Sequence, residues 1–198
     1  MEPVVFITGR VLPLERSDVD TDQIIPSEWL KRIERTGFGA GLFSEWRDNP
    51  NFVLNKAEFQ GADILLAGRN FGTGSSREHA VWALVDYGFK AVISSKIADI
   101  FKNNSTRSGL VPVEVSEEVS EFLFNAVLAD PKLEITVDVE QRLVEIASLG
   151  YKAPFALDGA AQKRLLLGLD DIGSTLVYFD KIEEFESGRP KWLPAVAL

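Results

Sequence analysis

One stretch of the sequence has residue types and spacing suited to chemistry, Gly72-Thr73-Gly74-Ser75-Ser76-Arg77-Glu78-His79-Ala80. The apolar run at 64–67 before it predicts a short buried strand, and the apolar spacing at 81–85 after it predicts a helix. The first-turn amides of such a helix point outward with a partial positive charge behind them. The stretch therefore predicts an anion-binding site between a strand and a helix.

The side chains in this stretch suit a small anion better than a nucleotide. Paired glycines let the backbone turn sharply, and Arg77 adds a planar cation that can grip a carboxylate with two bonds. A dinucleotide fingerprint needs glycine where Arg77 stands, and a P-loop needs Gly-Lys-Ser/Thr. The alternative is that Ser75 or Ser76 merely caps the helix, with Glu78 completing a capping box.

A second polar loop, at 17–26, contains alternating aspartates that resemble the opening of a calcium loop. Gln23 stands where that loop needs its turn glycine, and Trp29 stands where it needs the bidentate glutamate. Aspartate and threonine in such a loop more often bond neighbouring backbone amides and fix a turn. We therefore expect a wall of a polar site here rather than a calcium site.

The composition narrows the functional class. The net charge of −9 and the absence of a basic stripe argue against nucleic-acid binding. The chain has no cysteine, so it cannot by itself hold an iron–sulfur cluster or a cysteine-bound zinc ion, and no other metal site is expected. No secretory signal or membrane-spanning run is visible, so the expected location is the cytoplasm.

Elements that position the motif alternate along the chain from residue 61. Strands are expected there at 64–67, 91–94 and 109–113, with helices at 78–88, 97–104 and 117–128, and a separate first strand is expected at 4–7. Such alternation predicts a parallel sheet, whose ligands sit beyond the carboxyl ends of the strands. The alternating patterns at 133–138 and 142–146 predict an antiparallel pair.

We expect one domain over 1–198, with an irregular region at about 27–59 and a C-terminal helical segment at about 158–187. The irregular region is either a lid or binding loop, or an arm folded over the core. The apolar stripe of the C-terminal segment is expected to pack on its own domain, with the helix broken near Gly168 or Gly173. A partner surface is the alternative fate of that stripe.

The two polar loops together resemble the aconitase superfamily, and within it the small subunits of 3-isopropylmalate dehydratase, also called isopropylmalate isomerase. The likeness covers nearly the whole chain, and the Gly-Ser-Ser-Arg-Glu motif in this setting is highly specific. The segments that carry it are Asp20-Thr21-Asp22-Gln23-Ile24-Ile25-Pro26, Phe71 to Ala80, Asn103-Asn104, Gly109-Leu110-Val111-Pro112, Phe38 to Trp46 and Leu169-Asp170-Asp171-Ile172.

This resemblance implies an α/β fold, a three-layer β/β/α swivelling domain with a mostly parallel central sheet, a smaller antiparallel sheet and helices. It implies a hydro-lyase that interconverts 2-isopropylmalate and 3-isopropylmalate through 2-isopropylmaleate, in leucine biosynthesis. The partner would be a large subunit that carries a [4Fe–4S] cluster, in a heterodimer or higher assembly. The substrate would be a small dicarboxylate.

Residue roles also follow from the resemblance. Ser75 would take the carbon proton as an alkoxide, Ser76 would hydrogen-bond the substrate, and Arg77 would clamp a carboxylate. Positioning or substrate-binding roles fall to Gly74, Asp20, Thr21 and Asp22, and specificity roles to Trp29, Leu30, Lys31 and Arg32. Gly72, Glu78 and His79 would support the loop.

The chain departs from single-chain aconitases, which have a further substrate-binding arginine in a Ser-x-Arg context. Arg35 and Arg47 lie in the region without that motif, which argues against a citrate-type tricarboxylate. Two alternatives stay open. One is a related hydro-lyase small subunit for homoaconitate or citraconate-type substrates, and the other is a non-catalytic anion-binding module.

Overall fold

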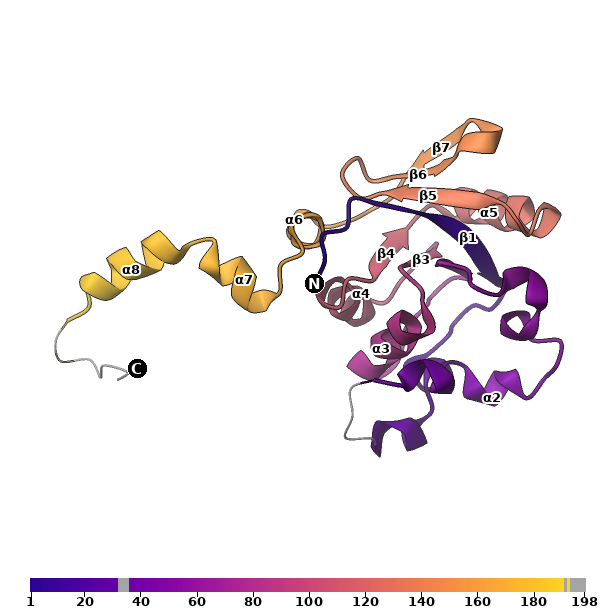
Figure 1. The fold of residues 1–198 in the computed structure, drawn as a ribbon, viewed down its shortest axis with the longest axis horizontal. Helices are drawn as coiled ribbons and strands as arrows, with labels where there is room; N and C mark the ends of the chain where they lie inside the picture. Colours follow the sequence, from indigo (N-terminus) through magenta and orange to yellow (C-terminus); the bar gives the residue numbers. More distant parts are fainter. Residues whose placement is uncertain (32–35, 191, 193–198) are drawn as a thin grey trace.

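The structure, a computed structural model, describes residues 1–31, 36–190 and 192. In this part of the chain, seven strands form one curled sheet in the order β4-β3-β2-β1-β5-β6-β7 (Figure 1). The strands are β1 (Phe6–Leu14), β2 (Ile64–Ala67), β3 (Ala91–Ser94), β4 (Val111–Glu114), β5 (Glu134–Asp138), β6 (Leu143–Ile146) and β7 (Tyr151–Pro154).

The half of the sheet from β1 to β4 is parallel, as the alternation of apolar runs predicts. All residues of β2 and β3 are buried, because both faces of this half are covered. Helices α3 (Glu78–Tyr87) and α4 (Asp99–Arg107) connect these strands and pack against each other. Helix α5 (Glu117–Ala129) follows β4 and packs against β1.

The other half of the sheet is antiparallel, and it shares β1 with the parallel half. The expected strand at 4–7 is in fact the longer β1, which pairs with β5 over Phe6–Arg10 and with β2 over Val11–Leu14. The predicted pair at 133–138 and 142–146 is confirmed as β5 and β6, and β7 adds an edge strand that we did not predict. The expected fold class is therefore confirmed, with its two sheets continuous through one strand.

The irregular region at 27–59 contains short helical turns rather than an open loop. They are η1 (Ser27–Lys31), η2 (Phe38–Gly41), α2 (Ser44–Arg47), η3 (Val53–Asn55) and η4 (Ala57–Phe59), preceded by α1 (Thr21–Ile24). Phe38, Leu42 and Phe43 are fully buried in the core. Of the two interpretations, the structure favours an arm folded over the core.

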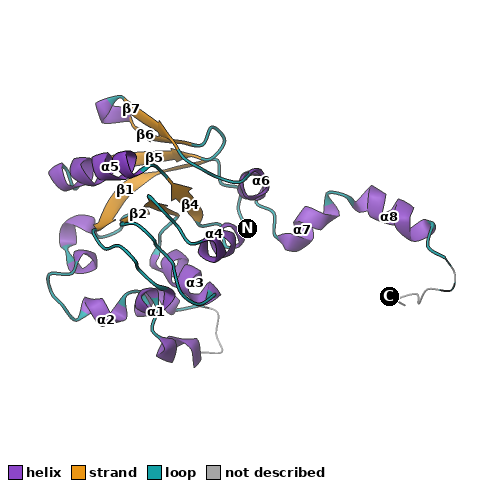
Figure 2. Ribbon diagram, turned by 180° about the vertical axis from the view of Figure 1, so that it is seen from behind, coloured by secondary structure: helices purple, strands orange, loops and turns teal. Residues whose placement is uncertain are grey.

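The C-terminal segment differs from its prediction. Helix α6 (Gly159–Leu167) ends at Gly168, where the break was expected, and it buries Leu165. Helices α7 (Asp171–Leu176) and α8 (Phe179–Ser187) extend away from the body (Figures 1 and 2). The expectation that the stripe packs on its own domain is confirmed for Leu165 of α6, but it is wrong for α7 and α8, where Ile172 is 71% exposed and Phe185 73%. Leu169 is half-buried, and Asp171 still pairs with Arg107 and Arg164, so the helices leave the body after this point.

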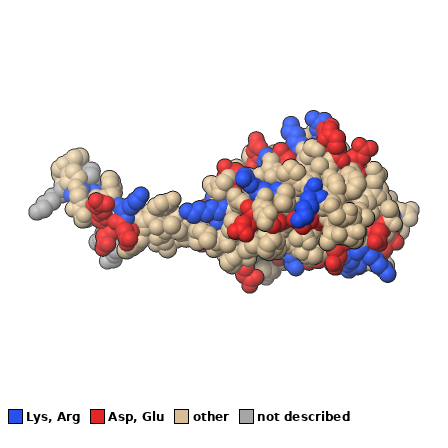
Figure 3. All heavy atoms as spheres, turned by 90° about the horizontal axis from the view of Figure 1, so that it is seen from above, with Lys and Arg blue, Asp and Glu red and all other residues tan. Residues whose placement is uncertain are grey.

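The surface carries charges of both signs. Lys and Arg are interspersed with Asp and Glu over the body on the face in Figure 3, and acidic side chains gather on the C-terminal helices. Among the described residues, no helix is both long and apolar enough to cross a membrane.

Candidate functional site

Two loops from distant parts of the chain meet at the carboxyl end of the parallel strands. The amide of Thr21 donates to the carbonyl of Thr73 at 2.9 Å, and the amide of Gly72 donates to the carbonyl of Val19 at 2.8 Å. Asp20 forms an isolated parallel bridge with Thr73. These backbone bonds hold the two polar loops in one register, so side chains from both face one place.

The glycines of the motif are required by the backbone and by the neighbouring helix. Gly72 has φ of 74° and Gly74 has φ of 90°, a region that side chains rarely adopt. A Cβ atom on Gly72 would overlap the ring of Phe101 in α4. The loop can therefore lie directly against α4 only because residue 72 has no side chain.

The buried side chain of Thr21 holds the backbone of Ser75. The hydroxyl of Thr21 donates to the carbonyl of Ser75 at 3.0 Å, and its oxygen lies 3.4 Å from the Ser75 Oγ atom. Thr21 is only 2% exposed, whereas Ser75 is exposed. This arrangement sets the position of the serine backbone and leaves its hydroxyl accessible.

Arg77 lies at the entrance of α3 and faces Asp22. It occupies the N-cap position of this helix, and its side chain makes no capping hydrogen bond. Ser75 and Ser76 precede the N-cap position, which argues against the alternative that one of them is an ordinary cap. The Arg77 guanidinium forms an ion pair with Asp22 and is 20% exposed at its side chain, against 55% for Asp22.

A cavity of about 260 Å³ opens at this junction. Five of the predicted site residues line it, and the first turn of α4 and one residue deeper in that helix complete the lining. The predicted residues are Thr21, Gly72, Gly74, Ser75 and Arg77, and the others are Ala98, Asp99, Ile100, Phe101 and Asn104. The cavity thus brings a hydroxyl, a guanidinium and a helix N-terminus together.

Other predicted residues of the two loops lie next to this cavity but do not line it. Asp20 caps α1, accepting from the amide of Gln23 at 2.8 Å, so it fixes a turn as expected. Ser76 and Glu78 are exposed. The ring of His79 lies 5.3 Å from that of Phe38 and 4.7 Å from that of Trp82, which ties the start of α3 to η2.

The predicted specificity residues lie on η1. Trp29 packs its ring over Gly41, where a Cβ atom would overlap it, and Leu30 is half-buried. Lys31 is exposed, and Arg32 lies outside the described residues. The described members of this group do not line the cavity.

Sequence reasoning assigned no role to the α4 residues of the cavity. A bridge between Phe71 and Ile97 brings the start of α4 to the motif, and the amide of Ala98 donates to the carbonyl of Phe71 at 3.0 Å. The sequence holds no local pattern for this contact, because the contact depends on the pairing of two segments that follow neighbouring strands. Asn103-Asn104 was recognised only as part of the resemblance.

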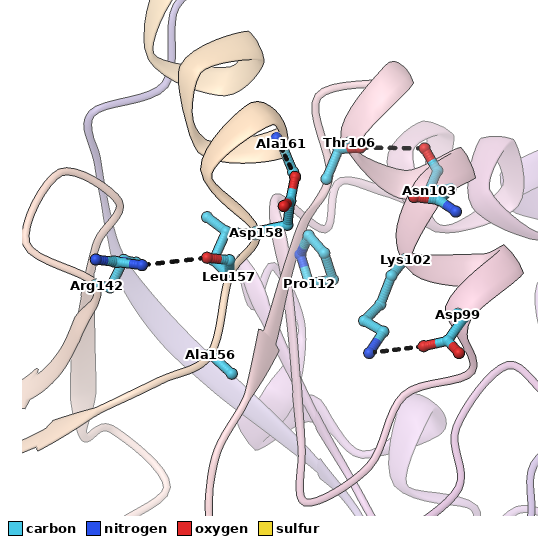
Figure 4. A pocket seen from close by; sticks show the side chains of 10 residues that line it. All are labelled: Asp99, Lys102, Asn103, Thr106, Pro112, Arg142, Ala156, Leu157, Asp158 and Ala161. Carbon is cyan, nitrogen blue, oxygen red and sulfur yellow. Dashed lines mark hydrogen bonds and ion pairs between the residues drawn. The ribbon is translucent and has the colours of Figure 1, made fainter.

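A larger cavity of about 480 Å³ lies on the other side of α4 (Figure 4). Its polar groups bind one another: Arg142 donates to the carbonyl of Leu157 at 3.3 Å, and Asp158 accepts from the amide of Ala161 at 3.0 Å. Partial burial lowers the pKa of Lys102, but hydrogen bonds and charges of Asp99 and Glu114 outweigh it and raise the pKa overall. These satisfied groups make this cavity a weaker candidate for a ligand.

The chain offers no ligand set for a metal centre in its described part. No group of three or more His, Asp or Glu side chains is arranged there to hold a metal ion, and the chain has no cysteine. An iron–sulfur cluster therefore does not fit the donors that this chain supplies.

Comparison with known proteins gives consistent matches. The family model described as the aconitase C-terminal domain matches residues 1–118. Curated relatives called 3-isopropylmalate dehydratase small subunit include one from Frankia casuarinae, 59% identical over 100% of both chains. Another is from Rubrobacter xylanophilus, 56% identical over 99% of this chain and 100% of that one. A solved structure titled 3-isopropylmalate dehydratase from Methanocaldococcus jannaschii has a TM-score of 0.64 at 26% identity, covering 92% of this chain and 98% of that chain.

Proposed function

The chain belongs to the aconitase C-terminal domain family, and from this membership we propose that it is the small subunit of a 3-isopropylmalate dehydratase. The enzyme is a hydro-lyase that interconverts 2-isopropylmalate and 3-isopropylmalate by dehydration and rehydration through 2-isopropylmaleate. In this proposal the reaction is a step of leucine biosynthesis and takes place in the cytoplasm. In this proposal residues 1–198 act as one swivelling domain that closes over a partner.

The partner in this proposal is a large subunit that carries a [4Fe–4S] cluster, in a heterodimer or a higher assembly. The absence of cysteine from this chain supports that division, because thiolates are the usual cluster ligands. When bound, such a cluster supplies a Lewis acid for the departing hydroxyl. The base and the groups that bind the substrate carboxylate must come from side chains such as those that line the cavity.

The observation that carries the proposal is that Ser75 and Arg77 line one cavity at a helix entrance. Dehydration of a hydroxy acid requires a base for the proton on the carbon beside a carboxylate. We assign this proton to the Oγ atom of Ser75, whose backbone Thr21 holds in place. Arg77 binds a carboxylate of the dicarboxylate substrate, since its guanidinium has donors beyond those that face Asp22.

A serine hydroxyl is a poor base, so the closed site must favour the alkoxide. The first turn of α3 and the charge of Arg77 both stabilise a negative charge next to Ser75. Closure of the partner over this exposed serine would remove water and strengthen both effects. Ser76 hydrogen-bonds the substrate, and Gly74 lets the backbone approach it.

The remaining predicted residues have supporting roles in this proposal. Asp20, Thr21 and Asp22 position the motif and its arginine. Gly72, Glu78 and His79 support the loop. The specificity residues Trp29, Leu30, Lys31 and Arg32 would contact the isopropyl group after closure, since the described ones lie outside the cavity of this chain alone.

Reconstitution tests the proposal. We expect the chain, mixed anaerobically with its large subunit, to turn over 3-isopropylmalate faster than homoaconitate or citraconate-type substrates. The control is each subunit alone, which should be inactive. Preference for another hydroxy acid would identify a related hydro-lyase. Failure to bind any cysteine-bearing partner of the size of an aconitase core would favour a stand-alone anion-binding module.

A further inference from the structure

The two polar loops leave neighbouring parallel strands, turn, and then pair again in the same register. Strands β1 and β2 end with Leu14 aligned to Ala67. Beyond the turns, the bridge between Asp20 and Thr73 joins residues with the same separation along the sequence. Each loop therefore spends the same number of residues on its turn, so the two turns must match each other for the pairing to resume.

Each turn contains a residue in the left-handed region of the backbone, and these two residues bind each other. Asp18 has φ of 57° and Asn70 has φ of 60°. The side-chain amide of Asn70 donates to the Oδ1 atom of Asp18 at 2.7 Å. The backbone amide of Asp18 donates to the carbonyl of Arg69, also at 2.7 Å. Aspartate and asparagine adopt this region more readily than most side chains, so the pair lets both chains turn at one level and joins the turns.

The loops are in direct contact on both sides of this pair. On the side of the strands, a Cβ atom on Gly68 would overlap the carbonyl of Arg16. On the side of the motif, the amides of Gly72 and Thr73 both donate to the carbonyl of Val19, at 2.8 and 3.2 Å. The pair thus lies within a continuous contact between the two loops, where a change in one turn is passed to the residues that follow it.

We propose that Asp18 and Asn70 are positioning residues for the reaction, because their hydrogen bond sets the register in which the first loop meets the motif. This inference rests on the proposed function and extends it to two residues that do not line the cavity. A slip between the loops would move the hydroxyl of Thr21 away from the carbonyl of Ser75, which it contacts at 3.0 Å. It would also move Asp22 away from the arginine that it pairs with. Small misplacements of reacting groups are costly in rate, so the pair acts on turnover through these neighbours.

An exchange of the two side chains tests the positioning role in the reconstituted enzyme at saturating large subunit. Asn70→Asp sets two carboxylates against each other, and we expect kcat for 3-isopropylmalate to fall at least about tenfold. The double variant Asp18→Asn/Asn70→Asp reverses donor and acceptor at unchanged net charge, so kcat should return to within about twofold of wild type. The matched control is Asn55→Asp, which should leave kcat unchanged, because the Asn55 amide donates to the carbonyls of Arg47 and Asn49 outside the two loops. An unchanged kcat in Asn70→Asp would overturn the inference, and so would a loss that the double variant does not restore.

Amide hydrogen exchange of the full chain alone separates this inference from the proposed function. In Asn70→Asp we expect the amides of Gly72 and Thr73 to exchange at least about fivefold faster than in wild type, because the contact between the loops opens more often. Asn70→Gly keeps the turn but lacks the side-chain amide, and should show faster exchange as well, whereas the double variant should restore protection. If the wild-type reconstituted enzyme is inactive on isopropylmalate, the proposed function fails, whereas these exchange rates still support the link between the loops. If both single variants exchange at the wild-type rate, the inference is refuted even when the enzyme is active.

Discussion

The guanidinium of Arg77 forms an ion pair with the carboxylate of Asp22, a residue 55 positions earlier in the chain. The pair joins the two polar loops, and Arg77 lines the cavity. A bidentate grip on a substrate carboxylate requires an oriented guanidinium. We interpret Asp22 as the residue that provides this orientation.

Asp22→Asn should lower kcat/KM of the reconstituted enzyme about tenfold, because Arg77 loses the charge that orients it. The stability of the chain should fall by about 1–2 kcal/mol, since Asp22 is 55% exposed but the Arg77 side chain that loses its partner is only 20% exposed. Kinetics and chemical denaturation measure the two effects. Glu117→Gln is the control, because it breaks the exposed pair with Arg69 and should leave both quantities unchanged. Equal kinetics for Asp22→Asn and wild type would show that Asp22 does not orient Arg77.

Arg77→Lys tests the clamp itself. Lysine keeps the charge but lacks the planar fork, so we expect a loss of about a hundredfold in kcat. The measurement is turnover of 3-isopropylmalate by the reconstituted pair. Arg69→Lys, at an exposed ion pair, should have no effect. Near-normal turnover of Arg77→Lys would refute the clamp.

Thr21→Val removes the hydroxyl that holds Ser75. The lost hydrogen bond to the carbonyl of Ser75 should cost about 1 kcal/mol of stability, and the activity should fall because the serine is less well placed. Thr8→Val is a matched control, since the Thr8 hydroxyl bonds Thr136 at 2.8 Å at an exposed position of β1. Chemical denaturation measures the stability of both variants, and turnover of the reconstituted enzyme shows which of them loses activity. Full activity of Thr21→Val would show that the position of Ser75 does not depend on the hydrogen bond from Thr21.

Gly72→Ala tests the close approach of the motif to α4. The new methyl group would overlap Phe101 at a φ of 74°, so overpacking and backbone strain together should cost about 2–4 kcal/mol. Gly150→Ala is the control, with a φ of 60° and no atom within 4 Å of the new Cβ. It should cost only the backbone strain, about 1 kcal/mol. Equal costs for the two variants would show that the contact with Phe101 relaxes easily.

Much of the parallel half of the fold could be predicted from the sequence, because its strands are short continuous apolar runs. The full length of β1 was harder to predict, because Gly9 and Pro13 interrupt its apolar pattern. Its two segments pair with different neighbours, β5 over Phe6–Arg10 and β2 over Val11–Leu14, and a strand tolerates proline where one side has no partner. The edge strand β7 escaped prediction because it contains Pro154 and buries only Ala153.

The site could be predicted in part. The motif residues can be recognised by their types and spacing. The resemblance of both polar loops to the aconitase superfamily indicates that they contribute to one site. The contribution of α4 could not be predicted, because it depends on the bridge between Phe71 and Ile97 rather than on any local pattern. The burial of Asn104 is a property of packing, and a lone asparagine on a helix carries no signal of it.

The C-terminal helices offer a test of where the stability of the chain resides. Ending the chain at Leu169 removes α7 and α8, whose described residues include no buried side chain. The exposed ion pairs of Asp171 with Arg107 and Arg164 are lost, but such pairs contribute little. We therefore expect the free energy of unfolding to change by less than about 1 kcal/mol. Ending the chain at Leu157 also removes the buried Leu165 of α6, and should cost at least about 2–5 kcal/mol. A large loss from the shorter deletion would mean that the apolar stripe packs on the body in solution.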